Sequence, residues 1–255
     1  MARDFAAGTD GLTGSASTAI ANGATSLSIA LWVWPDNFTA AYKLIGQWNG
    51  SFDKSIFLIQ LSGAGNNKPS FILTANASSQ DSDRRSSGTL TSGQWNHVVC
   101  TWTATDTFTF YLDGSSSAPE TWLTSEGISA AASSGSTPAI TVGKAADGGS
   151  LDGKMAEVAV WKNYVITAPE ASSLAKAYSP LFVNPSALSF YAPIIGRASP
   201  EIELILADNL TVSGAVNYAH PRIIYPSSPQ MRRFTTVAGA TAAQGAWKSL
   251  LGVGI

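Results

Sequence analysis

The sequence predicts an all-β protein, a two-sheet antiparallel sandwich with one short helix and a C-terminal extension. Three observations support this fold class. Short segments of alternating apolar and polar residues recur along the chain, and clusters of Gly, Pro, Asn, Asp and Ser separate them. Only 13% of the residues are charged, against about 25% in ordinary globular chains. A single segment before the C-terminal region carries both a helix start and a helix stop signal.

The first half of the chain provides three strand signals. Residues 25–35, TSLSIALWVWP, alternate between two faces, and one face carries Leu27, Ile29, Leu31 and Val33, the other Ser28, Ala30, Trp32 and Trp34. Residues 55–75 contain two apolar runs around a Gly- and Asn-rich connection, which predicts a hairpin with an extended loop. Residues 92–117 predict a second hairpin, in which Asp113 and Gly114 form a turn.

The second half continues the pattern and contains the helix. Residues 138–163 predict two more strands, with Val158 and Val160 on one face and Glu157, Ala159 and Trp161 on the other. Thr167 and Glu170 form a capping-box pattern, so we expect a helix that starts there and stops before Pro180. Residues 187–194 and 209–215 return to strand patterns.

Three quoted segments carry a resemblance to a known family. They are LSIALWVWP, SGQWNHVVCTWTATDTFTFYLDG and ITVGKAADGGSLDGKMAEVAVWKNYVITAPEASSLAKAY, in that order. They resemble the signature segments of the laminin-G-like, concanavalin A-like jelly-roll family over residues of about 20–195, which implies a jelly-roll sandwich. Ala156 stands where this family usually has an aspartate. The continuation from residue 179 resembles the extension that follows this domain in bacteriophage and prophage-encoded proteins.

We expect the chain to consist of a folded domain and a C-terminal arm. Residues 1–216 should form the jelly-roll domain, with its core at about 20–195, and residues 217–255 should form a C-terminal assembly arm. The arm has three prolines early, a small basic cluster and an apolar end with helical spacing. Its candidate assembly residues are Arg222, Arg232, Arg233, Trp247, Leu250 and Leu251.

Composition excludes several classes of partner. The net charge is −2, with 15 Lys and Arg against 17 Asp and Glu, so we expect no nucleic-acid partner. One cysteine and two histidines are too few for a Cys/His zinc site, and we expect no metal and no cofactor. The chain has neither the apolar core of a signal peptide nor a run of about 18 apolar residues. We therefore expect synthesis in the host cytoplasm and no membrane partner.

The sequence offers few candidates for catalysis. His97 has no carboxylate or second histidine in register beside it, which favours a structural strand residue. Cys100 shares a face with Val98 and Trp102, which is typical of a packed thiol. Only Glu201 and Glu203 come near to the carboxylate pairs of jelly-roll glycosidases, and they lie outside the recognisable sandwich. We therefore expect no enzymatic activity.

Sugar binding is the main candidate for a ligand site. Members of this family often bind sugars, and aromatic faces and amides suit pyranose rings and their hydroxyls. The candidate glycan-binding residues are Trp34, Trp48, Asn49 and Trp161, although tryptophans of a sandwich usually belong to its core. Loop oxygens for calcium are found at Asp36, Asp53, Asp113 and Asp152, without the density of a dedicated calcium loop.

These observations lead to one expected function and two alternatives. We expect a non-catalytic structural protein of a bacteriophage virion, most simply a capsid decoration or head-associated protein that displays the lectin-like domain. Its partners would be the major capsid protein or neighbouring copies, with a homo-oligomer in the particle. The alternative is a glycan-binding adhesin that recognises host surface glycans, as a tail fibre or cell-surface lectin does. A glycoside hydrolase is the third possibility.

Overall fold

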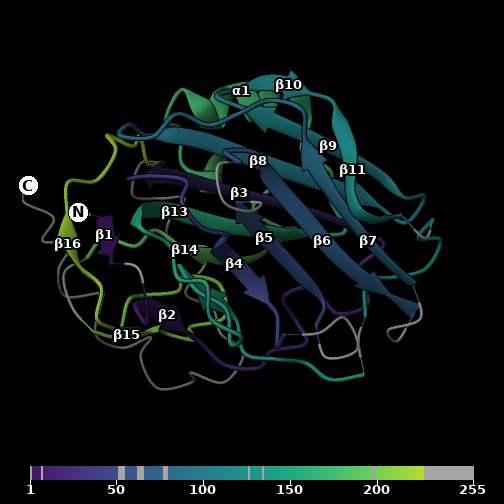
Figure 1. The fold of residues 1–255 in the computed structure, drawn as a ribbon, viewed down its shortest axis with the longest axis horizontal. Helices are drawn as coiled ribbons and strands as arrows, with labels where there is room; N and C mark the ends of the chain where they lie inside the picture. The colour runs from purple at the N-terminus through teal and green to yellow at the C-terminus, as the bar shows by residue number, and fades with distance from the viewer. Residues whose placement is uncertain are drawn as a thin grey trace, which may run out of the picture. The chain divides into compact units, whose positions relative to one another are not determined.

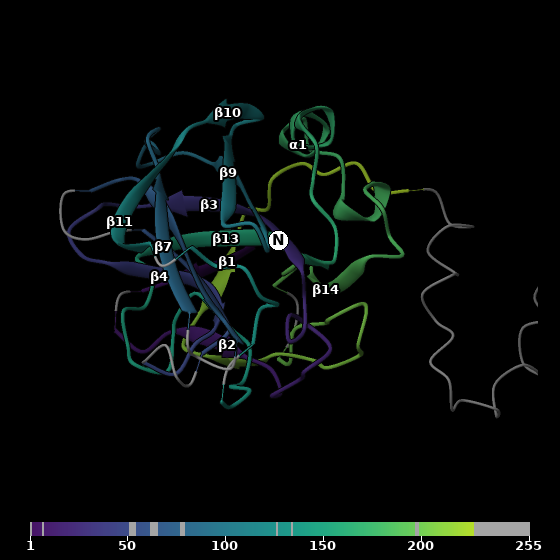
Figure 2. The ribbon, with the colours of Figure 1, turned by 90° about the vertical axis from the view of Figure 1, so that its right-hand side faces the viewer.

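The computed structural model of the protein describes residues 2–6, 8–50, 55–61, 66–76, 80–125, 127–133, 135–196 and 199–226. Within these residues, the chain forms two antiparallel sheets that are stacked face to face (Figures 1 and 2). Residues 1–225 belong to one compact unit. The expected all-β jelly-roll sandwich is confirmed.

Sheet 1 has eight strands in the order β10-β9-β8-β3-β13-β1-β16, and β14 also pairs with β13. β1 pairs with the first half of β13, and β14 pairs with its second half. Between the two halves, a bulge from Ala156 to Ala159 interrupts the pairing of β13 with β3. The strands are β1 (Ala2–Phe5), β3 (Ser26–Pro35), β8 (Asn96–Thr103), β9 (Thr107–Leu112), β10 (Ser115–Ser117), β13 (Gly153–Lys162), β14 (Leu188–Ala192) and β16 (Val216–Tyr218).

Sheet 2 also has eight strands, in the order β11-β7-β6-β5-β4-β12-β2-β15. All pairs of neighbouring strands in the sheet are antiparallel. The strands are β2 (Gly11–Thr13), β4 (Tyr42–Gln47), β5 (Phe57–Leu61), β6 (Pro69–Ala75), β7 (Gln80–Ser86), β11 (Pro119–Ser125), β12 (Thr141–Val142) and β15 (Thr211–Ser213).

The hydrophobic core lies between the two sheets and follows the alternation of the sequence. β3 contributes Leu27, Ile29, Leu31 and Val33, as expected, and each is at most 1% exposed. Facing strands of sheet 2 contribute residues such as Phe57, Ile59, Phe71 and Leu73. Because the side chains of a strand alternate, Trp32 and Trp34 point to the outer face of sheet 1.

One helix covers part of that outer face. Helix α1 (Ala168–Ala175) starts after Thr167, whose backbone N–H donates to the Glu170 carboxylate at 2.8 Å, so the expected capping box is confirmed. A short 3-10 helix, Pro180–Phe182, follows. Figure 2 shows α1 on the side of sheet 1 that faces away from sheet 2. Among the described residues, no helix has the length and apolar character needed to cross a membrane.

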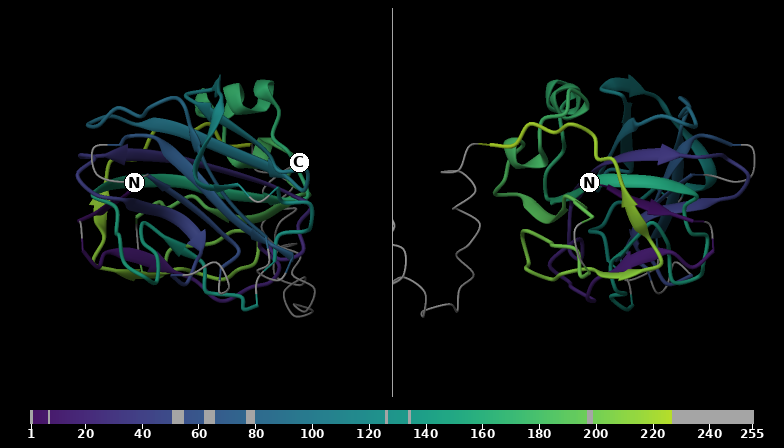
Figure 3. Two further views of the ribbon diagram at one scale, coloured as in Figure 1. Left: turned by 45° about the vertical axis from the view of Figure 1, so that its right-hand side comes forward. Right: turned by 90° about the vertical axis from the view of Figure 1, so that its left-hand side faces the viewer.

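The C-terminal part of the compact unit is tied to the N-terminal strands. Arg3 Nε donates to Glu201 Oε1 at 2.6 Å, and both side chains are buried. β15 pairs with β2 and β16 pairs with β1, so each sheet gains an edge strand (Figure 3). Tyr225 Oη donates to Glu157 Oε1 at 2.5 Å. The compact unit ends at Tyr225, beyond the boundary at residue 216 that we expected. β16 pairs with β1, Ile224 pairs with Tyr178, and Tyr225 is bonded to Glu157.

Candidate functional site

A depression on the outer face of sheet 2 brings together two of the residues expected to bind a glycan. It has a volume of about 390 Å³. Trp48 and Asn49 directly follow β4, and the neighbouring strands β12 and β2 supply Thr141 and Thr13. The complete lining consists of Thr13, Trp48, Asn49, Pro138, Ala139, Thr141, Lys144, Ala145 and Ala146. We call this depression the Trp48 pocket.

Strand register explains why these side chains share one face. Thr141 pairs with both Gly46 and Thr13, whereas their neighbours Val142, Ile45 and Leu12 point into the core. Gly11 has no side chain, and a Cβ there would lie 2.3 Å from Lys144 Cδ. The side chain of Lys144 can therefore lie across β2 toward the pocket.

The tryptophan of the pocket is held in a fixed orientation. Trp48 is only 6% exposed and packs with Leu58, Ile72 and Ala145 in a second apolar cluster on the outer face of sheet 2. Its Nε1–H donates to Asp147 Oδ2 at 3.2 Å. A ring fixed in this way gives the pocket a preformed apolar wall, and ligand binding costs it little side-chain entropy.

Asn49 supplies the polar contact next to this ring. Its backbone N–H donates to Ser55 Oγ at 2.9 Å, and the residue is exposed. The pocket therefore combines an aromatic ring, an exposed amide, an ammonium group and two hydroxyls, of which that of Thr141 also donates to the Gly46 carbonyl at 3.2 Å. None of the nine lining residues has a carboxylate.

A row of polar side chains continues across the outer face of sheet 2. Lys43 Nζ donates to Gln60 Oε1 at 2.6 Å, and both carboxylate oxygens of buried Asp83 lack a hydrogen-bond partner. Burial raises the pKa of Asp83 to about 7, although the Lys43 and Arg85 charges oppose the shift. Burial also lowers the pKa of Lys43. This row is therefore sensitive to pH near neutrality.

Trp34 lies on the other sheet, away from the Trp48 pocket. It is half-buried on the outer face of sheet 1, with its ring centroid 6.0 Å from Trp95 and 6.2 Å from Tyr218. The structure therefore divides the expected glycan-binding residues between the two outer faces.

Trp161 is a core residue, and its expected role in glycan binding is wrong. The side chain is 0% exposed, and its Nε1–H donates to the Val183 carbonyl at 2.7 Å. Its outward position on β13 is as expected, but the segment that contains α1 and the 3-10 helix covers this part of sheet 1.

The two glutamates that came nearest to a catalytic pair have structural roles. Glu201 pairs with Arg3 and accepts from the Gly196 N–H at 2.9 Å. Glu203 accepts backbone N–H groups of Tyr191, Ile205 and Leu206. Both are 2% exposed. Neither carboxylate is placed to act on a sugar in solution.

His97 and Cys100 are structural residues, as expected. His97 is 2% exposed, its ring centroid lies 5.0 Å from that of Trp32, and burial lowers its pKa to about 3. Cys100 is 0% exposed, and burial raises the pKa of its thiol. The Asp113 carboxylate accepts the His97 backbone N–H at 2.8 Å, and Asp113 and Gly114 have the positive φ of a turn.

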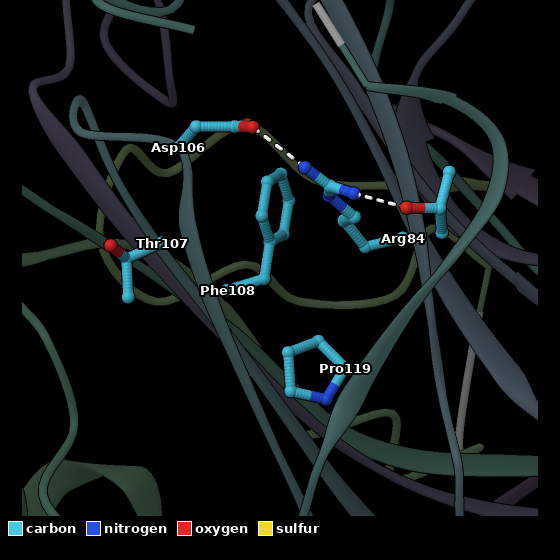
Figure 4. A pocket seen from close by; sticks show the side chains of 6 residues that line it. Arg84, Asp106, Thr107, Phe108 and Pro119 are labelled. Atoms are coloured by element: carbon cyan, nitrogen blue, oxygen red, sulfur yellow. Dashed lines mark hydrogen bonds and ion pairs between the residues drawn. The ribbon is translucent and has the colours of Figure 1, made fainter. Parts of the chain in front are cut away.

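A second depression, of about 310 Å³, lies at the Arg84 end of β7 (Figure 4). Arg84 Nη2 donates to Asp106 Oδ2 at 2.7 Å, Nη1 donates to Thr121, and the guanidinium carbon lies 6.0 Å from the centroid of the Phe108 ring. Arg84 is engaged by the protein, and no side-chain amide lines this depression, so it offers fewer groups to a sugar than the Trp48 pocket does.

Of the other residues expected to bind a partner or a metal, the structure describes only some. Arg222 is exposed. The arm residues Arg232, Arg233, Trp247, Leu250 and Leu251, and also Asp53, lie outside the described residues. Asp36 pairs with Lys154, and no group of three metal-ligating side chains is found in the described part of the chain.

The sequence did not reveal Thr13, Thr141 and Lys144 as partners of Trp48. Each lies on or beside a strand of two or three residues, too short for a periodic signal. The sequence predicts a turn at Lys144, which is followed by AADGG. Only the pairing of β12 with β2 shows that this turn lies beside the Trp48 pocket.

Comparison with known proteins identifies the fold. Residues 7–172 match the signature of the concanavalin A-like lectin/glucanases superfamily, laminin-G type. Among solved structures, a Bacteroides ovatus protein with a suggested role in carbohydrate binding is 17% identical, with a TM-score of 0.59. The alignment covers 88% of this chain but only 61% of that protein.

A heptameric SAP-like pentraxin from Limulus polyphemus is 15% identical, with a TM-score of 0.54, over 84% of this chain and 93% of the pentraxin. No curated protein matches the chain in sequence. The match to residues 7–172 covers more than half of the chain. The chain therefore belongs to the concanavalin A-like lectin/glucanases superfamily.

Proposed function

We propose that this protein is a non-catalytic carbohydrate-binding protein and that the Trp48 pocket holds the saccharide. One observation carries the proposal: Trp48, Asn49, two threonines and Lys144 line the same depression. The fixed indole of Trp48 gives the pocket an apolar wall for the C–H groups of a sugar, and the amide, hydroxyls and ammonium suit its oxygens.

Binding without hydrolysis is the better-supported activity. Most glycosidases use two carboxyl groups on either side of the scissile bond. The lining of the pocket has none, and Glu201 and Glu203 are engaged elsewhere. The solved structures described above support the fold, and the suggested role of the Bacteroides ovatus protein agrees with the proposal.

The proposal is tested by glycan-array screening followed by calorimetry with the best ligand. Asn49→Ala and Lys144→Ala should each weaken binding about tenfold, the loss of one or two hydrogen bonds. Asn217→Ala and Lys176→Ala remove exposed side chains of the same types elsewhere and should leave affinity unchanged. The proposal fails if no glycan binds, or if the pocket variants bind as tightly as their controls.

Display on a bacteriophage particle stays a prediction of the sequence. We propose that a virion, as capsid decoration or as tail adhesin, is the setting in which this domain would bind host glycans. The capsid alternative requires the C-terminal arm to contact the major capsid protein or a neighbouring copy. Because Tyr225 is bonded to Glu157, the truncation that tests this should remove residues 227–255 only. Unchanged incorporation of the truncated chain into particles would contradict an anchoring role.

A further inference from the structure

The open part of the outer face of sheet 1 carries aromatic side chains that the Trp48 pocket does not use. Trp34 comes from β3, Tyr218 from the edge strand β16, and Trp95 from the turn before β8. We call these three side chains the aromatic patch. Trp34 and Trp95 are half-buried, and Tyr218 is 36% exposed. Figures 1 and 3 show β16 beside β1 at one edge of the sandwich.

Lys154 contacts two of the three rings of the aromatic patch. Lys154 lies opposite both Trp34 and Asp4 in the sheet register. Its Nζ lies 4.9 Å from the centroid of the Tyr218 ring and 5.8 Å from that of Trp34. The side chain is only 8% exposed. The ammonium group thus makes cation–π contacts with two rings that come from distant parts of the chain, and it fixes their spacing.

The charge of this lysine is already satisfied by carboxylates. Lys154 Nζ donates to Asp36 Oδ1 and Oδ2 at 2.5 and 2.7 Å, and it lies 3.7 Å from Asp4 Oδ1. The two acidic side chains are more open than the lysine, at 39% exposed for Asp36 and 29% for Asp4. Carboxylate oxygens are therefore available next to the rings, whereas the ammonium group is not.

This combination indicates the chemistry of a ligand. Exposed aromatic rings accept the apolar face of a sugar, and carboxylates accept hydrogen bonds from its hydroxyls. One lysine against two aspartates leaves the site negative, which disfavours a ligand that carries carboxylates of its own. The Trp48 pocket differs, because Lys144 lines it and the neighbouring Asp147 carboxylate is engaged by the Trp48 Nε1–H.

We propose that the aromatic patch is a second saccharide-binding site, selective for neutral sugars over acidic ones. It lies on sheet 1, and the Trp48 pocket lies on sheet 2, so the two sites are independent and neither needs the other to bind. With both sites active, one molecule could contact two glycan chains, and its avidity for a polysaccharide would exceed the affinity of either site.

The test uses the full chain labelled with ¹⁵N and follows the tryptophan indole signals during titration. The neutral probes are hexasaccharides of glucose, xylose and mannose, and the acidic probe is hexagalacturonate. Each is added to about 10 mM, a range that detects weak sites. At least one neutral probe should shift the signals of Trp34 and Trp95. Hexagalacturonate should bind the patch at least about tenfold more weakly than that neutral probe.

Three variants separate stacking from other effects. Tyr218→Ala should weaken patch binding at least about tenfold, which corresponds to about 1.4 kcal/mol. Tyr218→Phe keeps the ring and should change affinity less than about twofold. Tyr178→Ala removes another exposed tyrosine, beyond the end of α1 and 40% exposed, and should have no effect. Melting curves for all variants show whether each is folded.

Several outcomes would overturn the proposal. It is wrong if no probe shifts the Trp34 or Trp95 signals, or if Tyr218→Ala and Tyr178→Ala behave alike. Shifts confined to the residues of the Trp48 pocket would refute the patch while they support the proposed function. Loss of self-association in Tyr218→Ala, with no response to sugars, would assign the patch to contact with a second copy instead.

Discussion

Two buried groups on opposite sheets should change the stability of the protein with pH in opposite directions. His97 has an ordinary pKa of 6.5, and burial lowers it to about 3 in the folded protein. A lowered folded pKa gives stability that is present above pH 6.5 and lost as the pH falls toward 3. Asp83 has an ordinary pKa of 3.8, and burial raises it to about 7. Its contribution is full below pH 3.8 and lost as the pH rises through 7.

The magnitudes follow from these shifts. Each pKa unit corresponds to about 1.4 kcal/mol, so between pH 3.8 and 6.5 the two groups change the free energy of unfolding by about 4 kcal/mol each, with opposite signs. In the wild-type protein these contributions nearly cancel. Relative to the wild type, His97→Phe should therefore gain stability on acidification, and Asp83→Asn should lose stability.

The assay is urea unfolding at several pH values for the wild type, both single variants and the double variant. The prediction concerns only differences between variants in the slope of the free energy of unfolding against pH, because each substitution also changes the stability at every pH. The double variant should recover a dependence close to that of the wild type, since distant sites contribute additively. If His97→Phe keeps the wild-type slope, His97 is not a buried neutral group and the description of the outer face of sheet 1 is wrong.

Three other predictions follow from buried side chains. Trp161→Ala should lower the free energy of unfolding by about 3–5 kcal/mol in urea titrations, and a loss below about 1 kcal/mol would contradict its place in the core. Glu201→Gln leaves Arg3 buried without its counter-ion and should cost about 3–5 kcal/mol by the same measurement, whereas a neutral effect would refute the buried ion pair. Cys100 should react with a thiol reagent only after unfolding, because burial raises its pKa, and rapid labelling of the native protein would show that it is accessible.

Local patterns predicted the strands whose faces differ in polarity. β3 and β8 have alternating residues between a core and an outer face, so the sequence alone indicated which side chains are buried. β7 was missed because its sequence, QDSDRRS, has no apolar residue. It forms a strand through its pairing with β6 and β11, and Asp83 and Arg85 point away from the core. Tertiary pairing here overrides a low strand propensity.

The candidate site could be predicted only in part. Trp48 and Asn49 were recognisable as an aromatic and an amide after a strand, whereas Lys144 reaches them only because β12 lies between β4 and β2. Trp161 and Trp34 occupy equivalent outward positions on neighbouring strands. Their exposure differs because residues 163–183 cover one and not the other, and no periodicity in the strands encodes that covering.

The measurement that tests the central claim most directly is the location of a bound saccharide. A crystal structure or backbone chemical-shift map with the best array ligand should place the sugar against Trp48 and Asn49, with contacts to Thr13, Thr141 and Lys144. Contacts confined to other surfaces, or a ligand that leaves the signals of these five residues unchanged, would contradict the assignment of this pocket as the carbohydrate site.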